Sequence, residues 1–172
     1  IIKDMWSIID SENISKKIVI DLFDGVETDL EEKVEVNSKK DLMVYSYRVA
    51  GTVGLMMSKI LKVKNKDALK GAIDLGIAMQ LTNIARDVCE DKNRNRKYIS
   101  PNFYSIKETI GLSQIFYQKS FNSISSIPLK SRFSVIVARR IYKKIGDYIL
   151  KQKNTETYIK AGNIYVPPFK KI

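Results

Sequence analysis

The apolar residues of this chain recur every three or four positions, and this spacing constrains its fold more than any other feature. Ile14, Ile18, Leu22 and Val26 form one such stripe, and the 172 residues include only 4 Pro and 8 Gly. Stripes of this period with few helix-breaking residues predict amphipathic α-helices. No segment shows the apolar/polar alternation of a half-buried strand. We therefore expect an all-α fold in a single domain covering residues 1–172.

The stripes and their interruptions predict five main helices. We expect them over residues 15–33, 41–61, 67–91, 105–125 and 129–151. Residues 34–38 are interpreted as a loop and 62–66 as a charged turn. Pro101 and Pro128 lie at helix junctions, because the residue before a proline disfavours helical geometry. The tail from Asn154 is expected to be mostly loop with short helical or extended pieces.

A polar strip runs along one face of the third expected helix. Gln80, Asn83, Asp87 and Asp91 are three or four positions apart, so they share one helix face. Asp87 and Asp91 are the only Asp pair at i, i+4, a spacing at which like charges repel. A divalent cation bound by Asn83, Asp87 and Asp91 would turn that repulsion into coordination. The alternative is a solvated face paired with neighbouring Arg side chains.

Composition limits the chemistry open to such a strip. The chain has no His and one Cys. This excludes Ser-His-Asp and Cys-His catalysis, His-ligated zinc, CxxC redox chemistry and internal disulfides. Any metal must be bound through oxygen atoms, which favours hard cations such as Mg²⁺, Mn²⁺ or Ca²⁺.

Charge is unevenly distributed along the chain. Residues 1–91 contain 13 basic and 16 acidic side chains, whereas residues 92–172 contain 17 basic and 3 acidic ones. A second half with a net charge of +14 favours anionic partners such as phosphate groups, nucleic acid or acidic lipid. The alternative is an ordinary solvated basic surface.

Two long motifs resemble the squalene/phytoene synthase family. Residues 45–54 read Tyr-Ser-Tyr-Arg-Val-Ala-Gly-Thr-Val-Gly, which is similar to the family's Tyr-x-Tyr-x-Val-Ala-Gly-x-Val-Gly element. Residues 80–91 read Gln-Leu-Thr-Asn-Ile-Ala-Arg-Asp-Val-Cys-Glu-Asp and continue to Arg96-Lys97-Tyr98, which resembles the family's second Asp-rich signature. Weaker similarity at residues 25–30, 138–142 and 164–166 extends the resemblance over nearly the whole chain.

The resemblance implies a function as well as a fold. Its fold is the isoprenoid-synthase helical bundle around a central cavity. The family condenses two prenyl diphosphates head to head, with Mg²⁺ on two Asp-rich motifs activating the departing pyrophosphate. Synthesis of phytoene from geranylgeranyl diphosphate is our first expectation, because the motif at residues 45–54 looks bacterial and carotenoid-like. Squalene or dehydrosqualene synthesis from farnesyl diphosphate is the alternative.

The resemblance also assigns roles to individual residues. The metal ligands are Asn83, Asp87 and Asp91; the catalytic residues are Asp87, Asp91 and Tyr45; the substrate-binding residues are Gln80, Arg86, Arg96, Arg140, Val49 and Gly54. The cofactor is Mg²⁺, with Mn²⁺ as a substitute, and the missing dinucleotide fingerprint disfavours NADPH. Tyr45 matches a tyrosine that lines the cavity and whose ring could stabilise a carbocation; the alternative is a core residue. Asp29 matches an acidic family position.

The sequence departs from the family pattern at its beginning. The first Asp-rich motif, Asp-x-x-x-Asp, is absent and is expected upstream of Ile1. Residues 101–129 also look about one helix short. We therefore expect an amino-terminally truncated bundle, the carboxy-terminal part of a longer synthase; the alternative is a short, degenerate relative.

Partners and location follow from the implied substrates. We expect a cytoplasmic protein that associates peripherally with the inner face of the membrane, where prenyl diphosphates partition, and that meets downstream isoprenoid enzymes there. The longest uncharged apolar stretch, residues 49–57, is well below the roughly 20 residues that span a bilayer. Nucleic acid is not an expected partner. The non-enzymatic alternatives are a prenyl-diphosphate-binding pseudoenzyme and a basic helical module that binds nucleic acid.

Overall fold

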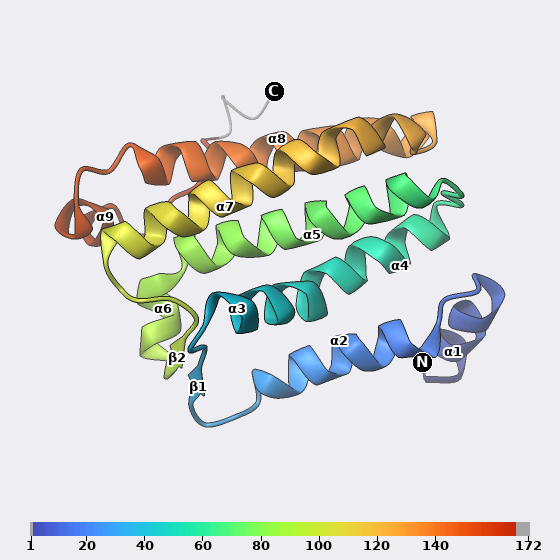
Figure 1. Cartoon of the computed structure of the whole chain (residues 1–172), viewed down its shortest axis with the longest axis horizontal. Helices are drawn as coiled ribbons and strands as arrows, with labels where there is room; N and C mark the ends of the chain where they lie inside the picture. Colours follow the sequence, from blue (N-terminus) through green and yellow to red (C-terminus); the bar gives the residue numbers. More distant parts are fainter. Residues whose placement is uncertain (1, 168–172) are drawn as a thin grey trace.

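The computed structural model describes residues 2–167, and most of them are helical (Figure 1). The helices are α1 (Ile2–Ser11), α2 (Lys16–Thr28), α3 (Lys39–Ser46), α4 (Thr52–Ile60), α5 (Lys66–Arg86), α6 (Val88–Asn93), α7 (Phe103–Phe121), α8 (Leu129–Leu150) and α9 (Thr155–Ala161). A π-helical turn, η1 (Tyr47–Gly51), joins α3 to α4, and a 3₁₀ turn, η2 (Asn122–Ser126), follows α7. The all-α prediction is confirmed for this part of the chain. Among these helices, none combines the length and apolar character that crossing a bilayer requires.

Helix α5 is the central element of the fold. In Figure 1 it lies between α4 and α7, and it packs against α8 as well. Its first turn is capped by the side chain of Asn65, which accepts hydrogen bonds from the backbone N–H groups of Asp67 and Ala68. Because neighbours cover α5 on several sides, buried residues such as Ile77 and Leu81 occupy much of its circumference.

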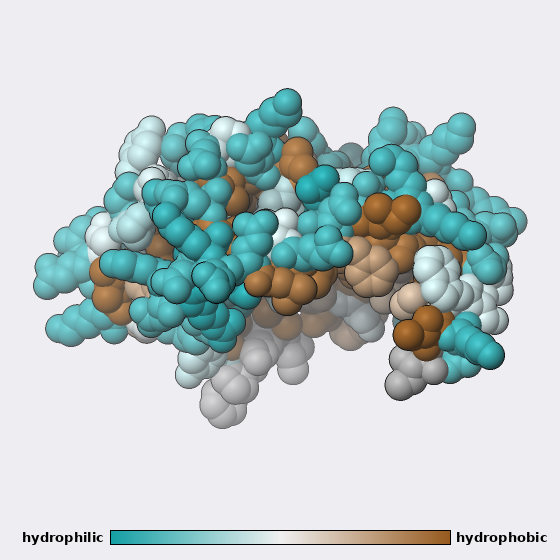
Figure 2. Space-filling model, turned by 90° about the horizontal axis from the view of Figure 1, so that it is seen from below, coloured by the Kyte–Doolittle hydropathy of each residue, from teal (hydrophilic) through white to brown (hydrophobic). Residues whose placement is uncertain are grey.

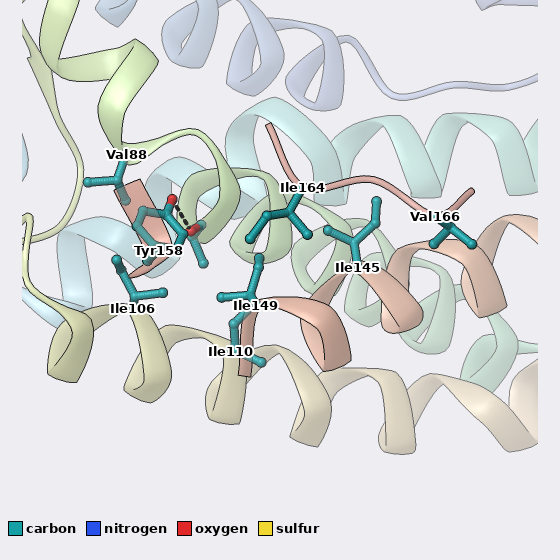
Figure 3. Packing of buried hydrophobic residues seen from close by; sticks show 9 residues of the cluster. Val88, Ile106, Ile110, Ile145, Ile149, Tyr158, Ile164 and Val166 are labelled. Atoms are coloured by element: carbon teal, nitrogen blue, oxygen red, sulfur yellow. Dashed lines mark hydrogen bonds between the residues drawn. The ribbon is translucent and has the colours of Figure 1, made fainter. Parts of the chain in front are cut away.

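One apolar cluster fixes the carboxyl end of α5 (Figure 3). Its buried members are Ala85, Val88, Ile106, Ile110, Ile145, Ile149, Tyr158, Ile164 and Val166. The cluster joins α5, α6, α7 and α8 to α9 and the tail that follows it. Helix α9 is thus one of the short helical pieces expected after Asn154, and Tyr158 brings it against the end of α5.

The segment between α2 and α3 differs from the prediction. Helix α2 ends at Thr28, and β1 (Val34–Glu35) pairs in parallel with β2 (Arg96–Lys97), with Val34 opposite Arg96. The expected loop over residues 34–38 is therefore corrected at residues 34–35, which form a short strand, while residues 36–38 connect it to α3. Strands of two residues are too short to show alternation in a sequence. The pairing joins the end of α2 to the segment after α6.

Two predicted helices contain an interruption. The expected helix over residues 41–61 contains η1, in which the N–H of Thr52 donates to the carbonyl of Tyr47, five residues earlier. The expected helix over residues 67–91 is divided into α5 and α6 at Asp87, whose φ and ψ are −100° and 13°. π-Helical turns are frequent at functional sites, and the φ and ψ of Asp87 lie near the sparsely populated region in which many active-site residues are found.

The α2 side of the molecule exposes apolar side chains. Figure 2 views this side, and apolar patches interrupt its hydrophilic surface. On α2, the exposed apolar residues are Ile20, Phe23 and Val26, whereas Val19 and Gly25 are buried. Helix α2 therefore contacts η1 and α4 through only part of its surface.

Candidate functional site

The polar strip lies where α5 ends and α6 begins. Gln80 and Asn83 are in the last two turns of α5, Asp87 is at the interruption and Asp91 is in α6. Backbone hydrogen bonds run from the N–H of Asp87 to Asn83 and from the N–H of Asp91 to Asp87, each 2.8 Å long. The helical spacing is thus retained across the interruption, as the sequence predicts.

The hydroxyl of Tyr158 stabilises the interruption at Asp87. It donates hydrogen bonds to the carbonyl oxygens of Ala85 at 2.9 Å and Arg86 at 2.7 Å. These carbonyls would otherwise lack partners at the end of a helix. Sequence reasoning did not identify Tyr158, because its partners are more than seventy positions away.

The two carboxylates of the strip have different surroundings. The guanidinium of Arg86 binds Asp87 through two hydrogen bonds, both 2.7 Å long. Arg86 is therefore an ion-pair partner of Asp87 in this structure, the alternative interpretation of the sequence. Burial, and after it the charge of Asp87, raise the pKa of Asp91 to about 6, while the positive charge of Arg96 acts in the opposite direction.

The donor atoms of the strip suit a hard cation. The side-chain oxygen of Asn83 is buried and has no hydrogen-bond partner among the described residues, although buried polar atoms are normally paired. With the carboxylates of Asp87 and Asp91, it makes a set of oxygen ligands of the kind Mg²⁺ prefers. Within residues 2–167 no three acidic, His or Cys side chains are grouped to hold a metal. The strip therefore offers, at most, part of the oxygen ligand set that such a cation needs.

An apolar cavity of about 460 Å³ adjoins the amino end of the strip. Gln80, Asn83, Val49 and Gly54 are among its lining residues. The other lining residues come from η1, α4, α5, α7, η2, α8 and the connecting segments, and they are mostly apolar. The structure thus brings four of the predicted site residues together around one cavity.

Two glycines bring α5 into backbone contact with η1 and α4 beside this cavity. A Cβ atom at Gly54 would lie 2.2 Å from the carbonyl oxygen of Ala72, and one at Gly76 would lie 2.2 Å from that of Ala50. These four residues also line the cavity. Any side chain larger than hydrogen at either glycine would therefore force the two helices apart.

Tyr45 is placed differently from the expectation. It is buried, and its ring stacks on that of Tyr98 with centroids 4.7 Å apart. Its hydroxyl donates to the carboxylate of Asp29 at 3.0 Å, and it does not line the apolar cavity. The expectation of a cavity-lining ring is thereby corrected, because hydrogen bonding to Asp29 draws Tyr45 to the α2 side of α3.

The two remaining predicted arginines, Arg96 and Arg140, lie in different parts of the structure. Arg96, in β2, lines a small cavity together with Asp91 and Tyr98 and donates to the backbone carbonyl of Asp29 at 2.8 Å. Arg140 is exposed on α8, and no hydrogen bond or ion pair joins it to the described residues. Its neighbour Arg139 instead contacts α7, donating to the carbonyl of Tyr117 at 2.8 Å. The structure therefore groups Arg96, but not Arg140, with the strip.

Comparison with known proteins gives the same family as the motifs. A family model described as squalene/phytoene synthase matches residues 6–102. A 15-cis-phytoene synthase from Paracoccus sp. is 33% identical over 150 residues, which cover 77% of this chain and 49% of that protein. Phytoene synthase 1 of Zea mays is 30% identical over 156 residues, covering 75% and 38%. The chain spans about half the length or less of these two relatives.

Solved structures show the same fold. A squalene synthase from Alicyclobacillus acidocaldarius superposes with a TM-score of 0.73 and 15% identity, over 84% of this chain and 62% of that one. A ligand-bound dehydrosqualene synthase superposes with a TM-score of 0.67 and 25% identity, over 86% and 66%. These superpositions confirm the isoprenoid-synthase helical fold. With the match over residues 6–102, they show that the chain belongs to the squalene/phytoene synthase family.

Proposed function

We propose that this chain takes part in the head-to-head condensation of two geranylgeranyl diphosphates to phytoene, with loss of pyrophosphate. One observation supports this most directly: an apolar cavity is bounded at one end by Gln80 and Asn83, and the strip continues from there to Asp87 and Asp91. A prenyl diphosphate has the matching form, a long apolar chain with an anionic head. Apolar surface buried in such a cavity contributes about 25 cal/mol per Å² to binding.

We propose that Asn83, Asp87 and Asp91 bind Mg²⁺, or Mn²⁺ as a substitute. The buried, unpartnered oxygen of Asn83 supports this assignment, because a cation would supply the missing partner. Bound Mg²⁺ would neutralise charge that develops on the departing pyrophosphate. Members of this family bind prenyl diphosphates with divalent metal.

The chain's own residues supply the rest of the proposed chemistry. Arg96 lies beside Asp91 and can stabilise the pyrophosphate oxygens through its planar guanidinium. Arg86 can do the same once Asp87 binds a cation and releases it. At Gly54 and Gly76 the wall is formed by close-packed backbone, which leaves no room for water between the two segments there.

The names of relatives favour phytoene, made from geranylgeranyl diphosphate, over squalene or dehydrosqualene, made from farnesyl diphosphate. Relatives from Paracoccus, Pantoea ananas and Zea mays are all phytoene synthases. The structural neighbours are a squalene synthase and a dehydrosqualene synthase, so farnesyl diphosphate is the alternative substrate. Product analysis with each diphosphate and Mg²⁺ distinguishes the two.

The proposal predicts that Asp87→Ala in the intact protein abolishes product formation from geranylgeranyl diphosphate, because it removes one of the two carboxylates. Asp67→Ala, which changes an exposed carboxylate in the first turn of the same helix, is the control and should retain the wild-type rate. Chromatography of the extracted products gives the readout. Near-wild-type phytoene formation by Asp87→Ala would contradict the metal assignment. An intact protein that binds Mg²⁺ and the substrate but forms no product would instead be a binding protein.

A further inference from the structure

Asp29 lies directly after α2, outside the strip and outside the apolar cavity, and binds two tyrosines. The hydroxyl of Tyr98 donates to Oδ1 at 2.6 Å, and the hydroxyl of Tyr45 reaches both carboxylate oxygens at 3.0 Å. The two hydroxyls are themselves 3.1 Å apart. One carboxylate therefore joins the end of α2 to α3 and to the segment after β2.

Both tyrosines act as donors in this cluster. Burial is the largest cause that raises the pKa of Tyr45 and of Tyr98 above the usual value for a tyrosine, so both hydroxyls keep their protons. A carboxylate can accept from both O–H groups through either oxygen, whereas an amide offers only one accepting oxygen and places N–H donors at the other position. The stacked rings of Tyr45 and Tyr98 hold the two hydroxyls side by side at the Asp29 carboxylate.

The backbone of Asp29 contacts the strip through Arg96. The Arg96 guanidinium donates to the Asp29 carbonyl at 2.8 Å, while pairing of β2 with β1 fixes the Arg96 backbone. Arg96 and Tyr98 line the same small cavity as Asp91. Asp29 thus contacts Arg96 and Tyr98, the two residues that line the small cavity with Asp91.

We infer that Asp29 is a positioning residue, which holds Tyr98 and Arg96 so that the Arg96 guanidinium faces the pyrophosphate bound at the strip. This inference rests on the proposed function, because it requires pyrophosphate and Mg²⁺ to bind there. Asp29 acts through Arg96 and Tyr98 and does not itself contact the substrate. The same arrangement explains why Tyr45 lies away from the apolar cavity.

The test is a calorimetric titration of the chain with inorganic pyrophosphate in saturating Mg²⁺. Asp29→Asn should weaken pyrophosphate binding about 10-fold, as loss of an orienting partner commonly does. Arg96→Gln should weaken it at least as much, and the double variant should be no weaker than Arg96→Gln alone, because the Asp29 carboxylate affects pyrophosphate only through the placement of the Arg96 guanidinium. Tyr98→Phe should also weaken pyrophosphate binding.

Asp21→Asn is the matched control. Asp21 is also on α2 and accepts a hydrogen bond from a tyrosine hydroxyl, that of Tyr47 at 3.2 Å, but it does not contact Arg96. The Asp21→Asn change should therefore leave the affinity for pyrophosphate unchanged. Thermal unfolding of each variant, together with hydrogen exchange at the Val34 and Val36 amides that bond to residues 95 and 97, shows whether the fold around β2 is retained.

The outcomes separate the inference from the proposed function. Wild-type affinity in Asp29→Asn, with Arg96→Gln weakened, would overturn the inference alone. Equal weakening by Asp21→Asn and Asp29→Asn would overturn it too, because the effect would then be general loss of packing. Failure of the wild-type chain to bind pyrophosphate with Mg²⁺ would overturn the proposed function and this inference with it. Selective weakening in Asp29→Asn supports both.

Discussion

Asn83 shows most clearly how one atom can indicate a ligand. Its amide oxygen is buried without a partner in the described chain, next to two carboxylates one and two turns further on. Leaving a buried polar atom unsatisfied costs about 1–3 kcal/mol. A residue that destabilises the metal-free fold is retained most simply when it has a ligand to bind.

We predict that Asn83→Leu keeps or raises the free energy of unfolding without metal, because it removes the unsatisfied oxygen. The same variant should lose the stabilisation that Mg²⁺ gives the wild-type chain. Denaturant unfolding with and without Mg²⁺ measures both effects. Asn122→Leu, at an exposed position of η2, is the control and should retain the Mg²⁺ effect. Full Mg²⁺ stabilisation of Asn83→Leu would contradict the assignment of Asn83 as a ligand.

The carboxylate of Asp74, which is not part of the strip, makes the stability of the fold depend on pH. Asp74 is partly buried on α5, and this burial raises its pKa above the usual value, although the charge of Lys119 partly offsets the effect. A carboxyl group whose pKa is higher in the folded than in the unfolded chain destabilises the fold when ionised. The penalty is complete above the folded pKa and disappears as the pH falls through it.

Asp74→Asn should therefore raise the free energy of unfolding at pH 7.5, and the gain should shrink as the pH approaches 4. Denaturant unfolding of both proteins across this range, without Mg²⁺, provides the comparison. Asp67→Asn serves as the exposed control on the same helix and should show no such trend. A gain independent of pH would mean that burial of the charge is not its cause.

The sequence predicts site residues well where their relation is local. Gln80, Asn83, Asp87 and Asp91 share a face because helical periodicity alone places them there, and the structure keeps that spacing. Tyr45 could not be placed in this way. Its position depends on Asp29 and Tyr98, which are 16 and 53 positions away, and no local pattern encodes such a contact.

At the scale of elements, apolar stripes predict the helices, whereas tertiary contacts determine their interruptions. Each main helix overlaps its predicted range, because burying one face requires a stripe of period 3.6. The division at Asp87 depends instead on Tyr158, from the far end of the chain. The β1–β2 pair likewise forms because α2 and α6 end close together. Helix α1 falls outside every predicted range.

The crossing of α4 and α5 gives a prediction at this scale. Gly76→Ala and Gly54→Ala should each lower the free energy of unfolding by about 1–3 kcal/mol, the usual cost of overpacking, since a Cβ would collide with backbone atoms. Gly111→Ala is the control, because a Cβ there meets nothing within 4 Å inside helix α7. It should stabilise the protein by about 0.5–1 kcal/mol. Denaturant unfolding measures all three, and equal effects at the three positions would contradict the close approach.

At the scale of the whole molecule, burial is concentrated around α5 and is sparse at the amino end. Helix α1 has one buried residue, Ile9, which belongs to a small cluster with Ile14 and Val19, whereas α5 has eight. Local stability follows the density of buried apolar contacts. The molecule should therefore open in parts and not only as a unit.

Native-state hydrogen exchange should show α1 opening locally while α5 and α7 exchange only through global unfolding. Low concentrations of denaturant should accelerate exchange in α5 and leave α1 nearly unaffected, because local opening exposes little surface. Amide-resolved measurements by NMR give the comparison. Equal protection and equal denaturant dependence in α1 and α5 would show that the amino end is part of the global unit.

The backbone contact between α4 and α5 also determines where the cavity can adapt to different occupants. On that side the wall consists of Gly54, Gly76 and two alanines, none of which has a rotatable side chain, so its contour is rigid. Elsewhere Met57 and Met79 line the cavity, and their unbranched thioethers can rearrange at little cost. The wall is thus rigid at the glycines and alanines and compliant at the two methionines, which can reshape around occupants of different length.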